Sequence, residues 1–113
     1  MGKYFITPDE RQGSCYYEFF AGEWKSRRMK FWDKSSICIS AENWSETGFE
    51  ALISAIVEDY KPYGPSKVRE KEWKLILQKA EIIGGELWMA VSEAKEWAVQ
   101  NFSQNEIFTI LGI

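Results

Sequence analysis

Alternation of apolar and polar residues marks three short strands in the first third of the chain. Residues 15–20 (CYYEFF) are rich in aromatic rings, residues 26–33 (SRRMKFWD) alternate between bulky and basic side chains, and residues 35–40 (SSICIS) alternate again. Successive side chains of a strand point to opposite faces, and aromatic residues favour strands. Because only short turns separate the segments, they predict an antiparallel meander, to which residues 3–6 (KYFI) add a short piece.

The alternation divides the strand residues between two faces of this sheet. One face consists of Cys15, Tyr17, Phe19, Met29, Phe31, Ile37 and Ile39, and the other of Tyr16, Glu18, Phe20, Arg28, Lys30, Trp32 and Cys38. A shift of one residue would exchange the two sets of a strand. If helices cover only the first face, the second presents aromatic rings beside charged groups, which is typical of protein-binding hot spots. We therefore predict a partner-binding surface that contains Tyr16, Glu18, Lys30 and Trp32.

Helical periodicity governs the middle of the chain. Apolar residues recur at spacings of three and four in 47–60, 68–83 and 86–102, so that each segment carries one apolar stripe. The stripe of the second segment ends with Ile83. Capping boxes at Asn43 and at Thr47 both fit the start of the first helix, which the pattern therefore leaves open by one turn. The sequence predicts three helices.

The final segment, FTILGI, is as apolar as a buried strand. Both of its alternating registers are apolar, since it follows Ile107 and contains Phe108, Ile110 and Leu111. A strand that is apolar on both faces lies between neighbouring strands or beneath a cover. The sequence thus predicts a single domain over residues 1–113 with a two-layer α+β fold. A mainly antiparallel sheet, the N-terminal meander plus the C-terminal strand, carries three helices on one face.

Composition restricts the chemistry that the chain can perform. Its 113 residues include no histidine and only two cysteines, which argues against histidine-based acid–base catalysis, Ser-His or Cys-His nucleophiles and a zinc site. Paired carboxylates occur only on predicted helix surfaces, whereas catalytic carboxylates need burial or a pocket. We expect no catalytic residue, no cofactor, no metal ligand and no enzymatic activity. Cys15 and Cys38 fall in predicted strands and are expected to be reduced, buried thiols.

Charge and hydropathy narrow the choice of partners. No apolar stretch has the length of a secretory signal or a membrane span, so we expect a cytoplasmic protein without a membrane partner. The net charge of −3 is opposite in sign to that of most nucleic-acid-binding domains. The segment 24–34 (WKSRRMKFWDK) fits either a single-stranded nucleic-acid platform or a ladder in which Arg28 and Lys30 pair across strands with Glu18. The alternation favours the ladder, and no nucleic-acid partner is expected.

Acidic residues line the outer face of the predicted helix over 47–60. Glu46, Glu50 and Glu58 follow a four-residue spacing, and Asp59 lies beside them. No basic residue lies four positions after Glu46 or Glu50, so repulsion between the carboxylates costs roughly a few tenths of a kcal/mol. Glu58 and Asp59 also stand at the helix end whose dipole disfavours negative charge. The pattern fits either a solvated face or an acidic ridge of these four residues that docks on a partner.

The order of these parts resembles that of small cytoplasmic immunity proteins from bacterial contact-dependent growth inhibition and related polymorphic toxin systems. The resemblance covers residues 15–113. It rests on the aromatic meander, ISAENW at a helix start, YKPYGPSKVREKEWKLIL, EWAVQNF and the terminal IFTILGI.

The resemblance implies a non-catalytic protein that binds a cognate toxin C-terminal domain and blocks its active site or substrate access, but it identifies no individual residue. Many such toxins are nucleases with basic clefts, which the acidic ridge would fit. The alternative is an intracellular adaptor or regulator that binds another protein or a peptide. The oligomeric state is left open, with a monomer favoured.

Overall fold

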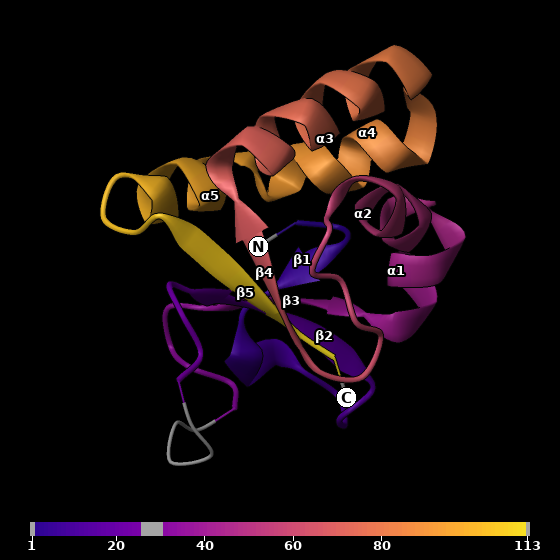
Figure 1. Cartoon of the computed structure of the whole chain (residues 1–113). Coiled ribbons are helices and arrows are strands. Elements are labelled where there is room, and N and C mark those ends of the chain that lie inside the picture. The colour runs from indigo at the N-terminus through magenta and orange to yellow at the C-terminus, as the bar shows by residue number, and fades with distance from the viewer. Residues whose placement is uncertain (1, 26–30, 113) are drawn as a thin grey trace.

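A five-stranded sheet is the framework of the fold (Figure 1). The computed structural model describes residues 2–25 and 31–112. Within them the strands are β1 (Phe5–Ile6), β2 (Tyr16–Ala21), β3 (Ile37–Ser40), β4 (Pro65–Arg69) and β5 (Ile107–Leu111). Their spatial order is β1-β3-β2-β5-β4, and every neighbouring pair is antiparallel.

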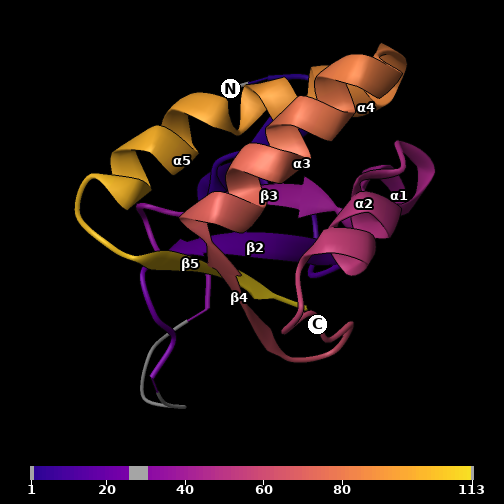
Figure 2. The same cartoon turned by 45° about the horizontal axis from the view of Figure 1, so that its top comes forward.

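Helices cover one face of this sheet (Figure 2). They are α1 (Ala41–Glu46), α2 (Phe49–Ile56), α3 (Glu70–Ile83), α4 (Gly85–Glu93) and α5 (Lys95–Phe102), and a short 3-10 helix, η1 (Pro8–Glu10), follows β1. In Figure 1, α3, α4 and α5 lie above the sheet and α1 and α2 lie at its right-hand side. The predicted two-layer α+β class is confirmed.

The main core lies between the helices and the face of the sheet that they cover. Phe19 on β2 is fully buried at its centre, and its ring stacks on that of Phe108 with 5.1 Å between ring centroids. Trp44 and Phe49 meet the same ring edge-on at 5.9 and 5.8 Å. Burying a side chain of this kind contributes about 1.5–3 kcal/mol. The predicted inward face of β2 and β3 is confirmed, since Tyr17, Phe19, Ile37 and Ile39 all belong to or pack against this core.

The last strand lies inside the sheet, as its two apolar faces predict. β5 pairs with β2 on one side, where Phe19 lies opposite Ile110, and with β4 on the other, where Val68 lies opposite Phe108. Four of its five residues are buried. The prediction of an interior closing strand is therefore confirmed.

β4 is a strand that the sequence does not predict, and its last two residues fall within the helix predicted over 68–83. Pro65–Arg69 forms an edge of the sheet, and α3 begins only at Glu70. Ser66 and Val68 are buried while their neighbours are exposed, which is the alternation with a period of two residues that is typical of a strand. Proline is tolerated at the start of an edge strand. The pattern is only five residues long and adjoins a longer helical one, which hides it.

One predicted helix, 86–102, is divided, and the one over 47–60 is preceded by a separate short helix, α1. Thr47 and Gly48 separate α1 from α2, and Gly48 has a φ of 88°, a left-handed conformation that favours glycine. α2 ends at Ile56 because Val57 is extended, so the predicted helix does not continue to residue 60. Ala94 separates α4 from α5, and its N–H donates to the carbonyl of Val91 three residues earlier instead of four.

The described parts of the connection between β2 and β3, residues 22–25 and 31–36, contact the face of the sheet away from the helices. Of the predicted strand 26–33, residues 26–30 lie outside the described residues, 31–33 are not in a strand, and β2 pairs directly with β3. The assignment of Phe31 to the core is wrong, because it is 53 % exposed and stacks on Trp24 with 5.0 Å between ring centroids. Trp24 in turn meets Phe20 edge-on at 5.3 Å. This connection covers the face that the sequence analysis leaves open.

The two cysteines have different environments. Cys38 on β3 is fully buried, and its burial, followed by the charge of Glu18, raises the pKa of its thiol to about 12. Cys15 lies just before β2, where its carbonyl accepts the N–H of Ala41 but its side chain is exposed. The expectation of burial is therefore confirmed for Cys38 and wrong for Cys15. Both are free thiols.

Candidate protein-binding surface

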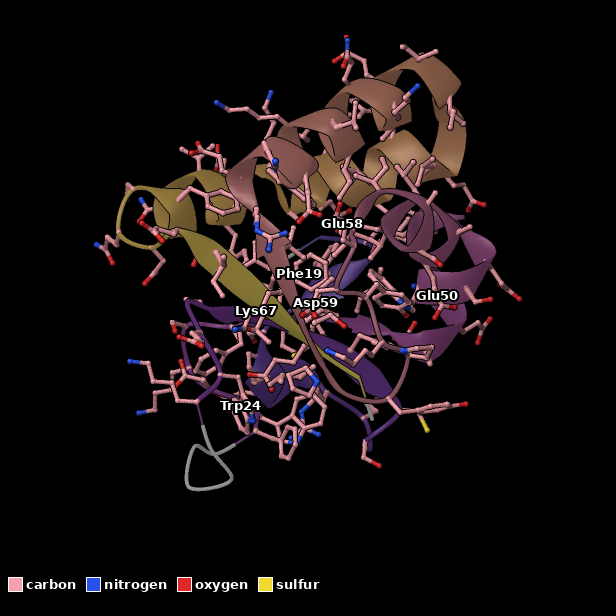
Figure 3. All side chains as sticks on the ribbon, viewed as in Figure 1. Phe19, Trp24, Glu50, Glu58, Asp59 and Lys67 are labelled. Atoms are coloured by element: carbon pink, nitrogen blue, oxygen red, sulfur yellow. The ribbon has the colours of Figure 1, made fainter. Side chains whose placement is uncertain are left out.

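The four residues of the predicted acidic ridge come from three parts of the fold. Glu46 ends α1, Glu50 lies in the first turn of α2, and Glu58 and Asp59 follow α2 in the turn before β4. Figure 3 shows Glu50 on the α1–α2 side and Asp59 near Lys67 of β4. The single helix that would align the four carboxylates does not form, so their predicted alignment is wrong.

Asp59 closes the outer edge of the sheet. Its carboxylate accepts the backbone N–H of Lys67 at 2.9 Å and the ammonium of Lys61 at 3.1 Å. These contacts, above all the backbone hydrogen bond, lower the pKa of Asp59. On the free edge of β4, the backbone groups of residues 65, 67 and 69 point away from β5. Pro65 has no N–H, and the N–H of Arg69 donates to Glu72 at 3.0 Å. Every outward donor of β4 is thus absent or occupied, which disfavours pairing with another strand.

Three glutamates hold separate segments of the chain together through backbone N–H groups, and we call Glu18, Glu72 and Glu93 the latching carboxylates. Glu93 at the end of α4 accepts the N–H groups of Lys3, Tyr4 and Phe5, each at 2.9 Å. Glu72 is buried and accepts those of Arg69 and Glu58 at 3.0 and 3.1 Å. Several donors converging on one carboxylate make strong, charge-assisted hydrogen bonds.

Glu18 is the most deeply buried of the latching carboxylates. It is fully buried on β2 and accepts the N–H groups of Trp32 and Asp33 at 2.7 and 3.0 Å and the hydroxyl of Ser36. Trp32 adopts a φ of 65°, which is uncommon for a residue with a bulky side chain. The guanidinium of Arg11 lies 3.8 Å above its ring. Glu18 therefore fixes the connection that covers this face.

The second predicted surface is consequently incomplete. The prediction that Glu18 faces a partner is wrong, because the β2–β3 connection encloses it. Tyr16 and Trp32 are half-buried, and the Tyr16 hydroxyl accepts the N–H of Gln12 at 3.3 Å. Lys30 lies outside the described residues, as does the predicted ladder of Arg28 and Lys30 with Glu18.

Glu50 belongs to a group of aromatic side chains where β2 begins. The hydroxyl of Tyr60 donates to Glu50 Oε2 at 2.6 Å, and the indole N–H of Trp44 donates to the same hydroxyl at 3.4 Å. The ring of Tyr17 stacks on Trp44 with 5.1 Å between centroids. Burial, followed by the hydrogen bond to Glu50, raises the pKa of Tyr60. These contacts hold the Glu50 carboxylate in place.

We define Tyr17, Glu50, Tyr60 and Tyr63 as the tyrosine–glutamate cluster. Tyr63 is 84 % exposed, and the other three members are half-buried. Burial, followed by the charge of Glu50 and then that of Tyr63, raises the pKa of the Tyr17 phenol. Of these four residues, only Glu50 is predicted to bind a partner; Tyr17 falls on the predicted helix-covered face of the sheet, and Tyr60 ends the apolar stripe of the predicted helix 47–60. The one feature of the sequence that could have indicated this cluster is the repeated tyrosine in the turn sequence YKPYGP.

Charge is strongly segregated around this cluster. Residues 41–60 contain five acidic residues and no lysine or arginine, a net charge of −5, so the rest of the chain carries +2. The exposed side chains of α1 and α2 are small or acidic: Glu42, Ser45, Glu46, Ala51, Ser54 and Ala55. Within residues 2–25 and 31–112, no ion pair involves Glu42, Glu46, Glu50 or Glu58. We call the exposed side of α1 and α2, together with Glu58 in the turn that follows α2, the acidic surface.

Exposed apolar side chains gather at the turn between α3 and α4. Ile82 is 76 % exposed, Ile83 is 64 % exposed, and Met89 is also exposed. The assignment of Ile83 to a core-facing stripe is wrong, because this turn projects beyond the sheet in both views (Figures 1 and 2). Exposed apolar groups that adjoin one another are candidates for contact with another protein.

Two hollows flank α5. The larger, of about 760 Å³, is open and is lined by residues that include Trp97, Gln100 and Asn101. Asn101 is already engaged, since it accepts the N–H of Gly22 at 2.9 Å and donates to the carbonyl of Ile107 at 3.1 Å. The smaller, of about 280 Å³, lies between α3 and α5. Neither hollow contains a residue that the sequence analysis selects for binding.

Among the described residues, no three His, Cys, Asp or Glu side chains are grouped so that they could hold a metal ion. None of the described helices is both long and apolar enough to cross a membrane.

Comparison of the chain with protein-family models, curated proteins and solved structures finds no match. The resemblance to immunity proteins therefore stays a prediction, and function has to be argued from the residues of this chain.

Proposed function

We propose that this chain is a non-catalytic immunity protein that binds and neutralises a cognate bacterial toxin domain. It does so by covering the active site or the path of the substrate, as a monomer in the cytoplasm, without nucleic acid, membrane or cofactor. The observation that carries the proposal is the acidic surface, where four glutamates have no basic partner among the described residues.

Electrostatics explain why such a surface suits a basic partner. Apart from the hydrogen bond that Glu50 accepts from Tyr60, these carboxylates lack internal partners among the described residues, and carboxylates that share a surface without counter-charges repel one another. A basic cleft, such as the substrate cleft of a nuclease, supplies the missing counter-charges and accelerates association. The small side chains of Ala51, Ser54 and Ala55 allow the backbone of a partner to come close to α2.

The test uses the gene that lies directly upstream of this chain in its native genome, which on this proposal encodes a toxin C-terminal domain. We expect cells that express the toxin domain to grow only when this chain is co-expressed, and the purified proteins to form a one-to-one complex by size-exclusion chromatography with light scattering. Failure to protect the cells together with failure to form a complex would overturn the proposal.

An adaptor or regulator that binds a different protein is the second candidate. The exposed Ile82, Ile83 and Met89 favour it, because an electrostatic contact through the acidic surface gives them no role. Affinity capture from the native host with mass spectrometry separates the two functions. An immunity protein recovers a toxin domain, whereas an adaptor recovers another protein and loses it when Ile82 and Ile83 are changed to serine.

A further inference from the structure

We propose that the tyrosine–glutamate cluster anchors an arginine side chain of the bound partner. This inference rests on the proposed function and names the side chain that the site recognises. The cluster combines a positioned carboxylate, that of Glu50, with three phenol rings, and Tyr63 leaves its ring almost fully exposed.

The Glu50 carboxylate is positioned but not saturated. Tyr60 holds Oε2 at 2.6 Å, and among the described residues this is the one hydrogen bond that the Glu50 side chain accepts. Two oxygens of an ionised carboxylate offer about four acceptor sites. The side chain is half-exposed, so the remaining sites are open to a donor from outside.

The counter-charge is missing locally. The nearest base along the chain, Lys61, pairs with Asp59 at 3.1 Å, and Lys67 pairs with Glu23 at 3.2 Å. Burial, followed by the charge of Glu50, raises the pKa of Tyr17, as expected for a phenol near this carboxylate. A cation from a partner would meet this carboxylate without displacing an existing ion pair.

The rings select arginine over lysine. A guanidinium is planar, stacks on aromatic faces and donates two parallel hydrogen bonds to a carboxylate, whereas an ammonium is a strongly hydrated point charge. Tyr63 offers a ring face to solvent, and Tyr17 is backed by Trp44, which is itself buried. Tyrosines and arginines are also the residues that dominate protein-binding hot spots.

Three of the four members of the cluster, Tyr17, Glu50 and Tyr60, are held by hydrogen bonds within the protein. Trp44 donates to Tyr60, Tyr60 donates to Glu50, and the hydroxyl of Tyr17 donates to the carbonyl of Pro62 at 3.4 Å. Side chains that are already ordered lose little entropy on binding, which improves affinity. The same chain of contacts connects α1, α2, β2 and the turn before β4.

The first test compares Glu50→Gln with Glu81→Gln by calorimetric titration with the toxin domain encoded upstream. Glutamine can still accept the Tyr60 hydroxyl, so the fold is retained, while the charge is lost. Glu81 is an exposed carboxylate on α3, outside the cluster, and is the matched control. We expect Glu50→Gln and Tyr63→Ala to raise the Kd by about thirtyfold or more, as hot-spot residues do, and Glu81→Gln to change it by less than about threefold.

The outcomes separate this inference from the proposed function. If the wild-type protein binds the toxin domain and Glu50→Gln behaves like Glu81→Gln, the anchor is refuted while the immunity function stands. If the wild-type protein does not bind the toxin domain, the immunity function fails and the anchor is decided by a second measurement.

That measurement is an NMR titration with the capped tripeptides acetyl-Gly-Arg-Gly-amide and acetyl-Gly-Lys-Gly-amide. We expect the arginine peptide to shift the signals of Tyr17, Glu50, Tyr60 and Tyr63, the lysine peptide to shift them less, and Glu50→Gln to abolish the difference. Equal shifts with both peptides, or none at these residues, would overturn the inference.

Discussion

The carboxylates that hold the sheet together and those of the acidic surface differ in what they bind. The latching carboxylates each accept two or three backbone N–H groups, and Glu93 reaches residues 88 to 90 positions away. On the acidic surface, Glu50 accepts one hydroxyl. A carboxylate with several internal donors contributes to stability, whereas one without them is available to a partner. The glutamates of this chain thus form two groups, one that stabilises the fold and one that is exposed and available to a partner.

Removal of the Glu18 carboxylate is expected to have the largest effect on stability, and it tests the difference between the two groups of glutamates most directly. Glu18→Ala leaves two backbone N–H groups and the Ser36 hydroxyl without their acceptor in a buried position, and each such loss costs about 1–3 kcal/mol. We expect the free energy of unfolding to fall by about 3 kcal/mol or more in urea titrations. Glu46→Ala, an exposed control, should change it by less than about 0.5 kcal/mol. Equal unfolding midpoints for the two variants would contradict the division.

Removing Glu93 should have the next largest effect. Glu93→Ala frees the three N–H groups of residues 3–5, which are partly exposed and can turn to water, so we expect a loss of about 1–2 kcal/mol. Hydrogen exchange of the amides of Tyr4 and Phe5 should accelerate far more than exchange in the core. Glu96→Ala on α5 is the control, and protected amides at residues 4 and 5 in Glu93→Ala would count against a latch.

Charge reversal on the acidic surface should slow binding, and among the described residues the one internal side-chain contact that it removes is the hydrogen bond from Tyr60 to Glu50. We expect the triple variant Glu46→Lys, Glu50→Lys and Glu58→Lys to associate with the toxin domain about tenfold or more slowly at low salt, with the difference shrinking as salt is added. Stopped-flow kinetics at several salt concentrations measure this. An unchanged association rate would remove the acidic surface from the interface.

Replacement of Asp59 should have the smallest effect on the free energy of unfolding, and that effect should depend on pH. Hydrogen bonding to Lys67 lowers the pKa of Asp59, so its stabilising contribution is complete above the unfolded pKa of about 3.9 and disappears as pH falls through the lower folded pKa. We expect the stability difference between wild type and Asp59→Ala to be present at pH 7 and to vanish below that window. Glu58→Ala is the neighbouring control. A difference that persists at pH 2 would rule out this linkage.

Regular patterns in the sequence predict much of the fold. Period-two alternation places Tyr17, Phe19, Ile37 and Ile39 on the covered face, and the two apolar faces of 107–111 place β5 inside the sheet. β4 is not predicted from the sequence, because its five alternating residues run directly into the longer helical pattern that follows. The breaks at Gly48 and Ala94 depend on local backbone geometry, to which apolar spacing is insensitive.

The candidate site is harder to predict than the fold, because the residues that contact one another in it come from segments far apart in the sequence. Alternation places Glu18 away from the helices, but it contains no information on whether a connection will cover that face. Glu50 is found from its charge and spacing, whereas Tyr60 looks like one more apolar member of a helix. It becomes a ligand of Glu50 only because α2 ends early, at Ile56, and the chain turns back.

The position of β5 has a consequence for how the protein is made. β5 follows all other described strands along the chain, yet it joins β2 to β4. Until residues 107–111 leave the ribosome, two hydrogen-bonding edges stay unpaired at the centre of the future sheet. A stalled or shortened chain that lacks them would offer both edges to other molecules, so biosynthesis rather than the finished fold is the stage at which aggregation threatens most.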